Sequence, residues 1–262
     1  MRRFAAATLA AVCSAAVLGA PSPTAEDIVA KNIEARGGID RIRAVQTLRM
    51  TGTMLVGEDR LPTTIEWKRP NKVRWEFEAD GQTAIQVYDG KKGWTLMPFE
   101  GNRDAEEMSD QELEDVALQA DLDGPLVDAA AKGNTVSLLG KDDADARPAW
   151  ELRIKRKNGD ERFVYIDAQT YLQTKTVTKR SAGGREIEIQ SIIDDYRSVE
   201  GLVLPHSFDA SAPGMPQGQS LRFTKTEVNV PIDDARFQKP ATEPAPKPTP
   251  RPERQTTPSH AR

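Results

Sequence analysis

The chain has 262 residues, 29% of them charged, and a formal net charge of −4. Proteins that bind nucleic acid neutralise its phosphates with clustered lysine and arginine, so an acidic chain argues against a nucleic-acid partner. The single cysteine, Cys13, lies in the apolar N-terminal segment. A chain without that segment has no thiol for disulfides or for cysteine catalysis. Bacterial lipoprotein signals place a small residue before the lipid-acceptor cysteine, and Val12 stands there instead.

Residues 1–20 have the pattern of a secretory signal peptide. Arg2 and Arg3 precede an apolar run from Phe4 to Leu18, and the small residues Gly19 and Ala20 follow. The run is shorter than the roughly 20 apolar residues that a membrane-spanning helix needs. We therefore expect cleavage close to residue 19 and export of a soluble chain.

The next segment predicts one helix and then a series of strands. Thr24 is a candidate N-cap, Asp27 stands three residues further on, and Gly37-Gly38 ends the helical pattern. Apolar and polar residues then alternate with a period of two, and Asp89-Gly90 is a hairpin-turn signal. The strands predicted here are 48–56, 65–67, 73–77, 85–87 and 94–96.

The middle of the chain changes period and then returns to strands. Ser109 to Ala120 predicts a helix, and Leu126 to Gly133 predicts a second, shorter one after the break at Gly124-Pro125. The strands that follow are predicted at 136–139, 150–154, 163–166, 171–177, 187–196, 202–208 and 221–230. The total is eleven or twelve antiparallel strands. Because a flat open sheet of that size is unstable, we predict an α+β fold with a highly curved antiparallel sheet whose mouth the helices cover.

The last segment, 239–262, contains seven prolines and almost no apolar residues. Such a composition cannot bury a core, so we predict an extended, disordered tail. The tail is either a spacer or a contact site for the cell wall or a membrane protein. The predicted organisation is therefore a signal peptide at 1–20, one domain at 21–238 and the tail at 239–262.

Few residues are suited to catalysis. His206 and His260 are the only histidines, whereas zinc sites and serine triads usually need several. The pairs Asp194-Asp195 and Asp233-Asp234 lie at strand or turn boundaries, where solvated aspartate is common. His206, beside Pro205, has the setting of a strand-edge residue. We therefore predict no enzyme, no cofactor and no metal site.

Three motifs carry a resemblance to a known family. They are "EWKRPNKVRWEF" at 66–77, "YDGKKGWTLMPFEGN" at 88–102 and "PIDDARFQKP" at 231–240. Together with the order helix, strands, helical insert, strands, they resemble the LolA-type periplasmic lipoprotein carriers over about residues 25–239. The resemblance implies an incomplete β-barrel with helices that form a lid over an apolar cavity, which in that family holds the acyl chains of a lipoprotein.

The resemblance also implies particular site residues. The family's functional arginine matches Arg69, which would bond backbone carbonyls of the lid helices and keep the empty carrier closed. Large apolar residues on the concave side of the sheet would form an adaptable surface for acyl chains. These are Met50, Met54, Trp67, Trp75, Phe77, Trp94, Leu96, Met97 and Phe99.

Two functions follow as alternatives. The first is a monomeric, non-enzymatic periplasmic carrier of acylated lipoprotein or lipid, working between an inner-membrane release complex and an outer-membrane receptor. The second is a sensing or scaffold module that uses the same fold to bind an envelope partner protein, with the proline-rich tail as a tether. The motifs leave open whether the cargo is a lipoprotein, a free lipid or another hydrophobic anchor.

Overall fold

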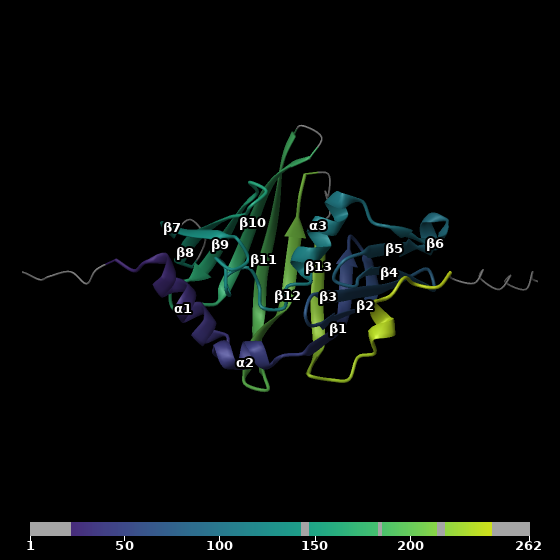
Figure 1. Ribbon diagram of the computed structural model, residues 1–262, viewed down its shortest axis with the longest axis horizontal. Coiled ribbons are helices and arrows are strands. Elements are labelled where there is room, and N and C mark those ends of the chain that lie inside the picture. The colour runs from purple at the N-terminus through teal and green to yellow at the C-terminus, as the bar shows by residue number, and fades with distance from the viewer. Residues whose placement is uncertain (1–21, 143–146, 183–184, 214–217, 243–262) are drawn as a thin grey trace, which may run out of the picture.

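Thirteen antiparallel strands form one sheet that bends into an open trough (Figure 1). The computed structural model describes residues 22–142, 147–182, 185–213 and 218–242. The sheet order is β6-β5-β4-β3-β2-β1-β13-β12-β11-β10-β9-β8-β7, so the sheet is not closed and β6 and β7 are its edges. The strands are β1 Thr47–Val56, β2 Asp59–Lys68, β3 Lys72–Ala79, β4 Gln82–Tyr88, β5 Gly93–Met97, β6 Asn102–Glu107, β7 Thr135–Asp142, β8 Ala149–Lys155, β9 Glu161–Asp167, β10 Gln173–Ala182, β11 Arg185–Val199, β12 Leu202–Ser211 and β13 Gln219–Val228.

The predicted curved antiparallel sheet is confirmed, with more strands than the eleven or twelve expected. The clearest omission is β6, whose sequence "NRDAEE" has a single apolar residue, Ala105, and no alternation to detect. Such a strand belongs at an edge, where one side of its backbone faces no neighbour and charged side chains discourage further pairing.

Three α-helices are present in the described part of the chain: α1 Ala25–Ala35, α2 Ile39–Ala44 and α3 Asp110–Gln119. α1 begins at Thr24 with a complete capping box, in which the Thr24 hydroxyl accepts from the Asp27 amide and the Asp27 carboxylate accepts from the Thr24 amide. Ser109 and Glu112 form the same arrangement at α3. Both predicted helix starts are confirmed. No helix among these described residues is long and apolar enough to cross a membrane.

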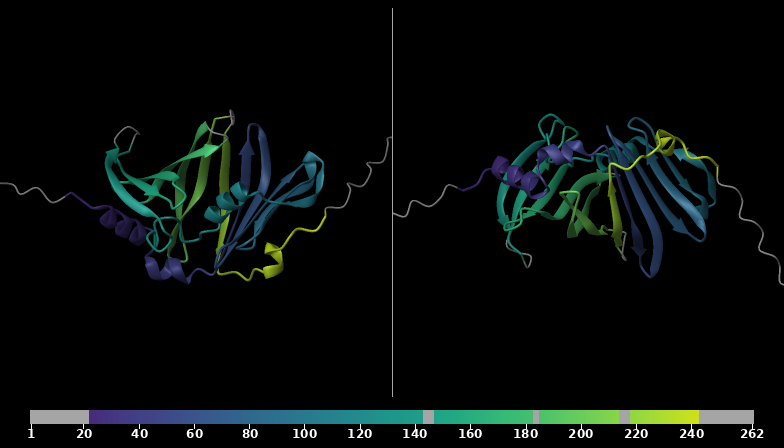
Figure 2. Two further views of the ribbon diagram at one scale, coloured as in Figure 1. Left: turned by 45° about the horizontal axis from the view of Figure 1, so that its top comes forward. Right: turned by 90° about the horizontal axis from the view of Figure 1, so that it is seen from below.

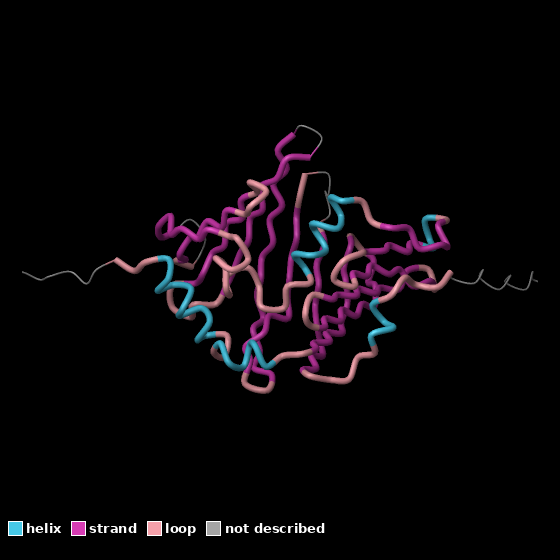
Figure 3. The backbone as a smooth tube through the Cα atoms, in the orientation of Figure 1, coloured by secondary structure: helices cyan, strands magenta, loops and turns pink. Residues whose placement is uncertain are grey.

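The second short helix predicted from Leu126 to Gly133 is wrong. This segment forms consecutive turns, drawn as loop between α3 and β7 in Figure 3. Asp128 adopts a φ of 52°, a left-handed conformation that an α-helix does not accommodate. Both carboxylate oxygens of Asp128 accept from Nη2 of Arg43 at 3.0 Å. The left-handed conformation of Asp128 therefore accompanies its contact with Arg43 of α2, and the local sequence pattern does not reveal this conformation.

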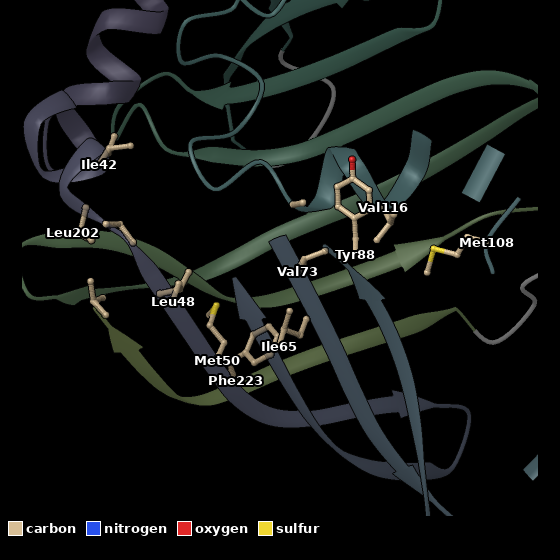
Figure 4. Packing of buried hydrophobic residues seen from close by; sticks show 13 residues of the cluster. Ile42, Leu48, Met50, Ile65, Val73, Tyr88, Met108, Val116, Leu202 and Phe223 are labelled. Carbon is tan, nitrogen blue, oxygen red and sulfur yellow. The ribbon is translucent and has the colours of Figure 1, made fainter. Parts of the chain in front are cut away.

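The concave face of the sheet is covered by the three helices. Ile42 of α2 and Val116 of α3 pack against Leu48, Met50 and Phe223 of the central strands (Figure 4). A second cluster lies beneath α1, over β8 and β9. Its fully buried members are Ile28, Leu152, Ile154, Val164 and Ile166.

The convex face carries a different cover, the C-terminal strap, which we define as residues 229–242. Figure 2 shows α3 inside the trough and the strap outside it. The strap contains the 3₁₀ helix η2 Asp234–Phe237, and Phe237 is fully buried beside Val87 and Leu96. Arg236 donates to Glu66 at 2.8 Å and to Glu76 at 2.9 Å. The strap is thus fixed by both apolar burial and ion pairs.

The ladder of paired residues between β12 and β13 is short. β12 pairs with β13 only from Ser207–Ala210 to Gln219–Arg222, whereas the β11–β12 and β1–β13 ladders are about twice as long. Beyond this ladder, Nε2 of His206 lies 2.9 Å from Oγ1 of Thr226. His206 is only 3% exposed in an interior strand, so its predicted place at a strand edge is wrong.

Candidate functional site

A cavity of about 260 Å³, the central cavity, lies between the concave face and the lid. We define the lid as α1, α2, α3 and the segment 120–126. The apolar part of the lining comes from β1, β2, β11 and β12 and from the lid, with Leu48, Met50, Trp67, Leu122, Ile193, Leu204 and Phe208. The polar part includes Asn32, Arg36, Gln173 and Tyr196. A mainly apolar lining with a few polar groups is the usual composition of a small-molecule site.

Arg69 connects two parts of the lid to the end of β2. Its Nε donates to the carbonyl oxygen of Val45 at 2.5 Å, and its Nη2 donates to that of Ile42 at 3.0 Å. These carbonyls are at the C-terminal end of α2, where a helix leaves acceptors without intrahelical partners. Nη1 and Nη2 also donate to the carboxylate of Asp123, at 2.9 and 2.5 Å. Asp123 lies in the segment after α3.

The Arg69–Asp123 pair favours its charged form. Hydrogen bonding from Arg69 holds the pKa of Asp123 below its ordinary value, and the charges of Lys132 and Arg36 act in the same direction against burial. The hydrogen bond to Asp123 in turn raises the pKa of Arg69. Their side chains are 22% and 15% exposed, so solvent screens this pair less than a fully exposed one.

Two further bonds hold the lid near the same place. The indole Nε1 of Trp67 donates to the carbonyl oxygen of Gln119 at 2.8 Å, at the end of α3. Nη1 of Arg36 donates to the carbonyl oxygen of Asp123 at 3.0 Å. Burial lowers the pKa of Arg36, while the neighbouring Tyr196, Asp123 and Asp121 act against that effect. Arg36, Trp67 and Arg69 therefore all bond to the segment between Gln119 and Asp123.

The residues predicted to line the cavity divide into three groups. Met50 and Trp67 do line it. Trp75, Phe77 and Phe99 form a chain of tilted rings, with centroids 6.2 and 5.9 Å apart, on the same concave face but outside the cavity lining. Two methionines also lie outside the lining: Met54 is 3% exposed in β1, and Met97 is half-buried at the end of β5.

Trp94 and Leu96 lie on the convex face, so the prediction that they line the cavity is wrong. Leu96 is 2% exposed and packs with Ile85, Val87 and Phe237 beneath the strap, and Trp94 packs against the same cluster. Alternation in β5 places Trp94 and Leu96 on one face, but both faces of this strand are covered. The sequence pattern alone could not show which face of β5 was the concave one.

Several lining residues were not predicted. Ile193, Tyr196, Leu204 and Phe208 belong to strands expected in the second half of the chain, but the strand pattern does not say which of their faces is concave. Asp123 has no such signal, because an isolated aspartate between α3 and a glycine reads as an ordinary loop residue.

No group of three or more His, Cys, Asp or Glu side chains suitable for holding a metal ion occurs among the described residues. The acidic pairs have other partners. Asp195 is bound by Arg197 at 2.5 Å, and Asp234 lies 2.7 Å from Lys72. The side chain of Asp233 caps η2 by accepting from the Ala235 amide.

Comparison with known proteins identifies the fold. No family model matches the chain, and no curated protein matches it. Solved structures do match. One is a LolA superfamily protein from Nitrosomonas europaea, with a TM-score of 0.57 and 14% identity over 83% of this chain and 99% of that one. The chain thus has a fold similar to that of this LolA superfamily protein.

Two further structures agree with this LolA-type fold. A putative outer membrane lipoprotein-sorting protein domain from Vibrio parahaemolyticus has a TM-score of 0.57 and 11% identity, over 81% of this chain and 97% of that one. A DUF1329 family protein from Desulfovibrio piger has a TM-score of 0.52 and 12% identity, over 82% and 97%. At such low identity the likeness concerns the fold, and the activity has to be argued from the site.

Proposed function

We propose that this protein is a non-enzymatic periplasmic carrier that shields the acyl chains of lipoproteins or lipids in its central cavity during transfer towards the outer membrane. The observation that carries the proposal is the position of Arg69, which bonds both α2 and Asp123, the residue between Leu122 and Gly124 of the cavity lining. Cargo would be received from an inner-membrane release complex and delivered to an outer-membrane receptor. The LolA-type fold and the predicted signal peptide support this proposal.

The energetic requirement on such a carrier is large. Each buried methylene of an acyl chain contributes roughly 0.8 kcal/mol, so a cargo with several chains would expose tens of kcal/mol of unfavourable surface to water. A soluble carrier therefore needs a closed apolar compartment. It must also release the cargo, which a fully packed core could not do.

The central cavity is small for a cargo with several acyl chains. Its volume of about 260 Å³ is at or below the lower end of the range of about 300–1,000 Å³ that is usual for ligand pockets. Several acyl chains need more room than this. In our proposal the lid moves away from the sheet when cargo enters, and Leu204 and Phe208 then contact the chains.

Arg69 would act as the latch of this lid. Hydrogen bonds that involve a charged group contribute only about 1.5–3 kcal/mol each in net terms. Breaking a few of them is a small cost beside the burial of acyl chains, so cargo can open the lid. An arginine suits this role because its planar guanidinium stays charged and reaches several acceptors at once.

The decisive experiment is native mass spectrometry of protein purified gently from the cell envelope. We expect a fraction of molecules to carry an acylated protein or a lipid. Purified empty protein should also take up a fluorescent fatty acid. Protein that is reproducibly empty and also fails to take up the fatty acid would overturn the proposal.

A further inference from the structure

A second cavity, of about 400 Å³, lies beside the central one. Asp121 and Pro125 of the lid line both cavities, so the two spaces are separated by the same short segment. The other walls of the second cavity are α3, the turn at Asn158 and the strands β8 and β9. Whereas the central cavity is largely apolar, the second cavity is lined by four basic side chains, Lys132, Arg156, Lys157 and Arg162.

Arg162 is the unusual member of this group. It lies in β9 opposite Ile154 of β8, and both residues line the cavity. Its Nε atom is buried and has no hydrogen-bond partner among the described residues. Burial lowers the pKa of Arg162, and the like charge of Arg156 lowers it further, while Asp115 and Asp121 favour the charged form. An arginine whose ordinary pKa exceeds 12 still carries its charge at neutral pH.

Three charged neighbours of Arg162 have partners of their own. Nζ of Lys132 donates to both carboxylate oxygens of Asp121 and to the carbonyl oxygen of Gly124. Arg156 pairs with Asp160 at 3.4 Å. Among the acidic residues, Glu114 accepts from Asn158 at 3.1 Å. Arg162 therefore lines the cavity with the Nε of its guanidinium unbonded to any described residue.

A buried guanidinium nitrogen without a hydrogen-bond partner is costly to a folded protein, because it loses hydration, and here only the attraction of Asp115 and Asp121 offsets that loss. Packing does not account for Arg162, since an apolar residue beside Ile154 would fill the same position without that cost. The geometry instead suits an oxyanion. Guanidinium groups bind phosphate and carboxylate through parallel, charge-assisted hydrogen bonds, which are strongest away from water.

We propose that the second cavity binds an oxyanion, a phosphate or a carboxylate, through Arg162. Its volume lies within the usual range of ligand pockets, about 300–1,000 Å³, so it can hold a lipid headgroup as well as a free ion. In the headgroup form, the ligand is an amphiphile whose acyl chain occupies the adjoining central cavity. That form rests on the proposed function, whereas the oxyanion site itself does not.

The test uses three ligands on the purified protein. Inorganic phosphate probes the oxyanion site alone. Lysophosphatidic acid and monoacylglycerol with the same chain differ only in the phosphate. We expect the wild-type protein to bind the phosphorylated lipid about tenfold more tightly or better, because charge-assisted hydrogen bonds are lost with the phosphate. Arg162→Met should reduce this preference to about threefold or less and should abolish binding of inorganic phosphate.

Arg153→Met is the matched control. Arg153 precedes Ile154 in β8, so its side chain points to the opposite face of the sheet, and it is 42% exposed. This variant should bind all three ligands like the wild type. A separate readout is the thermal stability of the ligand-free protein. Arg162→Met should melt at the same temperature as the wild type or higher, because it removes a buried donor that has no hydrogen-bond partner among the described residues.

The outcomes separate the alternatives. A preference that survives in Arg162→Met, or an Arg162→Met protein that melts well below the wild type, overturns the proposal, because Arg162 is then not the anion ligand or is a structural residue. Binding of inorganic phosphate without the phosphorylated lipid supports the site with a free ion as its ligand. If monoacylglycerol fails to bind while phosphate binds, the carrier function fails and the oxyanion site stands.

Discussion

The two faces of the sheet are covered in different ways. On the convex face, the strap buries Phe237 completely and joins Arg236 to Glu66, whose side chain is 3% exposed. On the concave face, the lid encloses two cavities, and polar bonds from Arg69 and Trp67 hold its segments. The strap fills the space on the convex face, so it separates from the sheet only when the protein unfolds. A cover over cavities has unfilled space beneath it, so its segments can move without unfolding the sheet.

The largest effect should come from the strap. Phe237→Ala should lower the free energy of unfolding by about 3–5 kcal/mol, because it empties a fully buried site of an aromatic ring. Denaturation in urea, followed by tryptophan fluorescence, measures this change. Fatty-acid uptake by the molecules that remain folded should be unaltered. A loss below about 1 kcal/mol would contradict the distinction between a packed cover and an opening one.

Arg69→Leu should have a smaller effect on stability, about 1–3 kcal/mol, because it removes hydrogen bonds rather than core packing. Its effect on function should be larger. The open form gains population, so a fluorescent fatty acid should bind equally or more tightly. Transfer to acceptor vesicles should slow, because closing the empty lid no longer forms the latch bonds. Arg69→Lys should be intermediate, since it keeps the charge and loses the planar fork. Wild-type binding and transfer in Arg69→Leu would mean that Arg69 is not a latch.

Acid should weaken the same latch. The folded-state pKa of Asp123 is lowered, so its pair with Arg69 contributes stability above the unfolded value of about 3.9 and loses it as the pH falls through the folded value. Fatty-acid exchange should therefore be constant from pH 8 to 5 and should accelerate below about pH 4. Asp123→Asn should remove this acceleration. An acceleration that persists in Asp123→Asn would assign the acid response to another group.

The smallest effect should come from Arg43→Leu. Arg43 pairs with Asp128 and so joins α2 to the turns after α3, as Arg69 joins α2 to Asp123, but both side chains are about half exposed. Exposed pairs contribute roughly 0.2–1 kcal/mol. The variant should transfer fatty acid at the wild-type rate. If Arg43→Leu slowed fatty-acid transfer as much as Arg69→Leu does, any bond between α2 and the segment after α3 would act as a latch.

The fold was largely accessible from the sequence, because its signals are local. Capping boxes at Thr24 and Ser109 predicted both longer helices, and alternation with a period of two predicted all strands but β6. The failures have non-local causes. Asp128 is left-handed where it meets Arg43, and His206 is buried by a neighbouring strand that is distant in sequence.

The candidate site was accessible only in part. The Lys-Arg-Pro-Asn motif singled out Arg69, whose contacts with the α2 carbonyls are those that the resemblance implies. Its partner Asp123 and the unpaired Arg162 are single charged residues without a motif. Their importance depends on what surrounds them after folding, and no local pattern encodes that. The error at Trp94 and Leu96 has a related cause, since alternation defines two faces without saying which one curves inward.

The short β12–β13 ladder has a mechanical consequence. It divides the sheet into two parts, β1–β6 with β13 and β7–β12. The two parts are joined along a strip of only four residue pairs. Leu48 and Met50 lie in one part of the sheet, and Leu204 and Phe208 lie in the other. The width of the central cavity therefore depends on the angle between the two parts. We expect bending to concentrate at this strip, and amide hydrogen exchange that is fastest around Ser207 and Arg222 would reveal it. In the proposed carrier function, a change in this single angle would fit the cavity to cargo of different width.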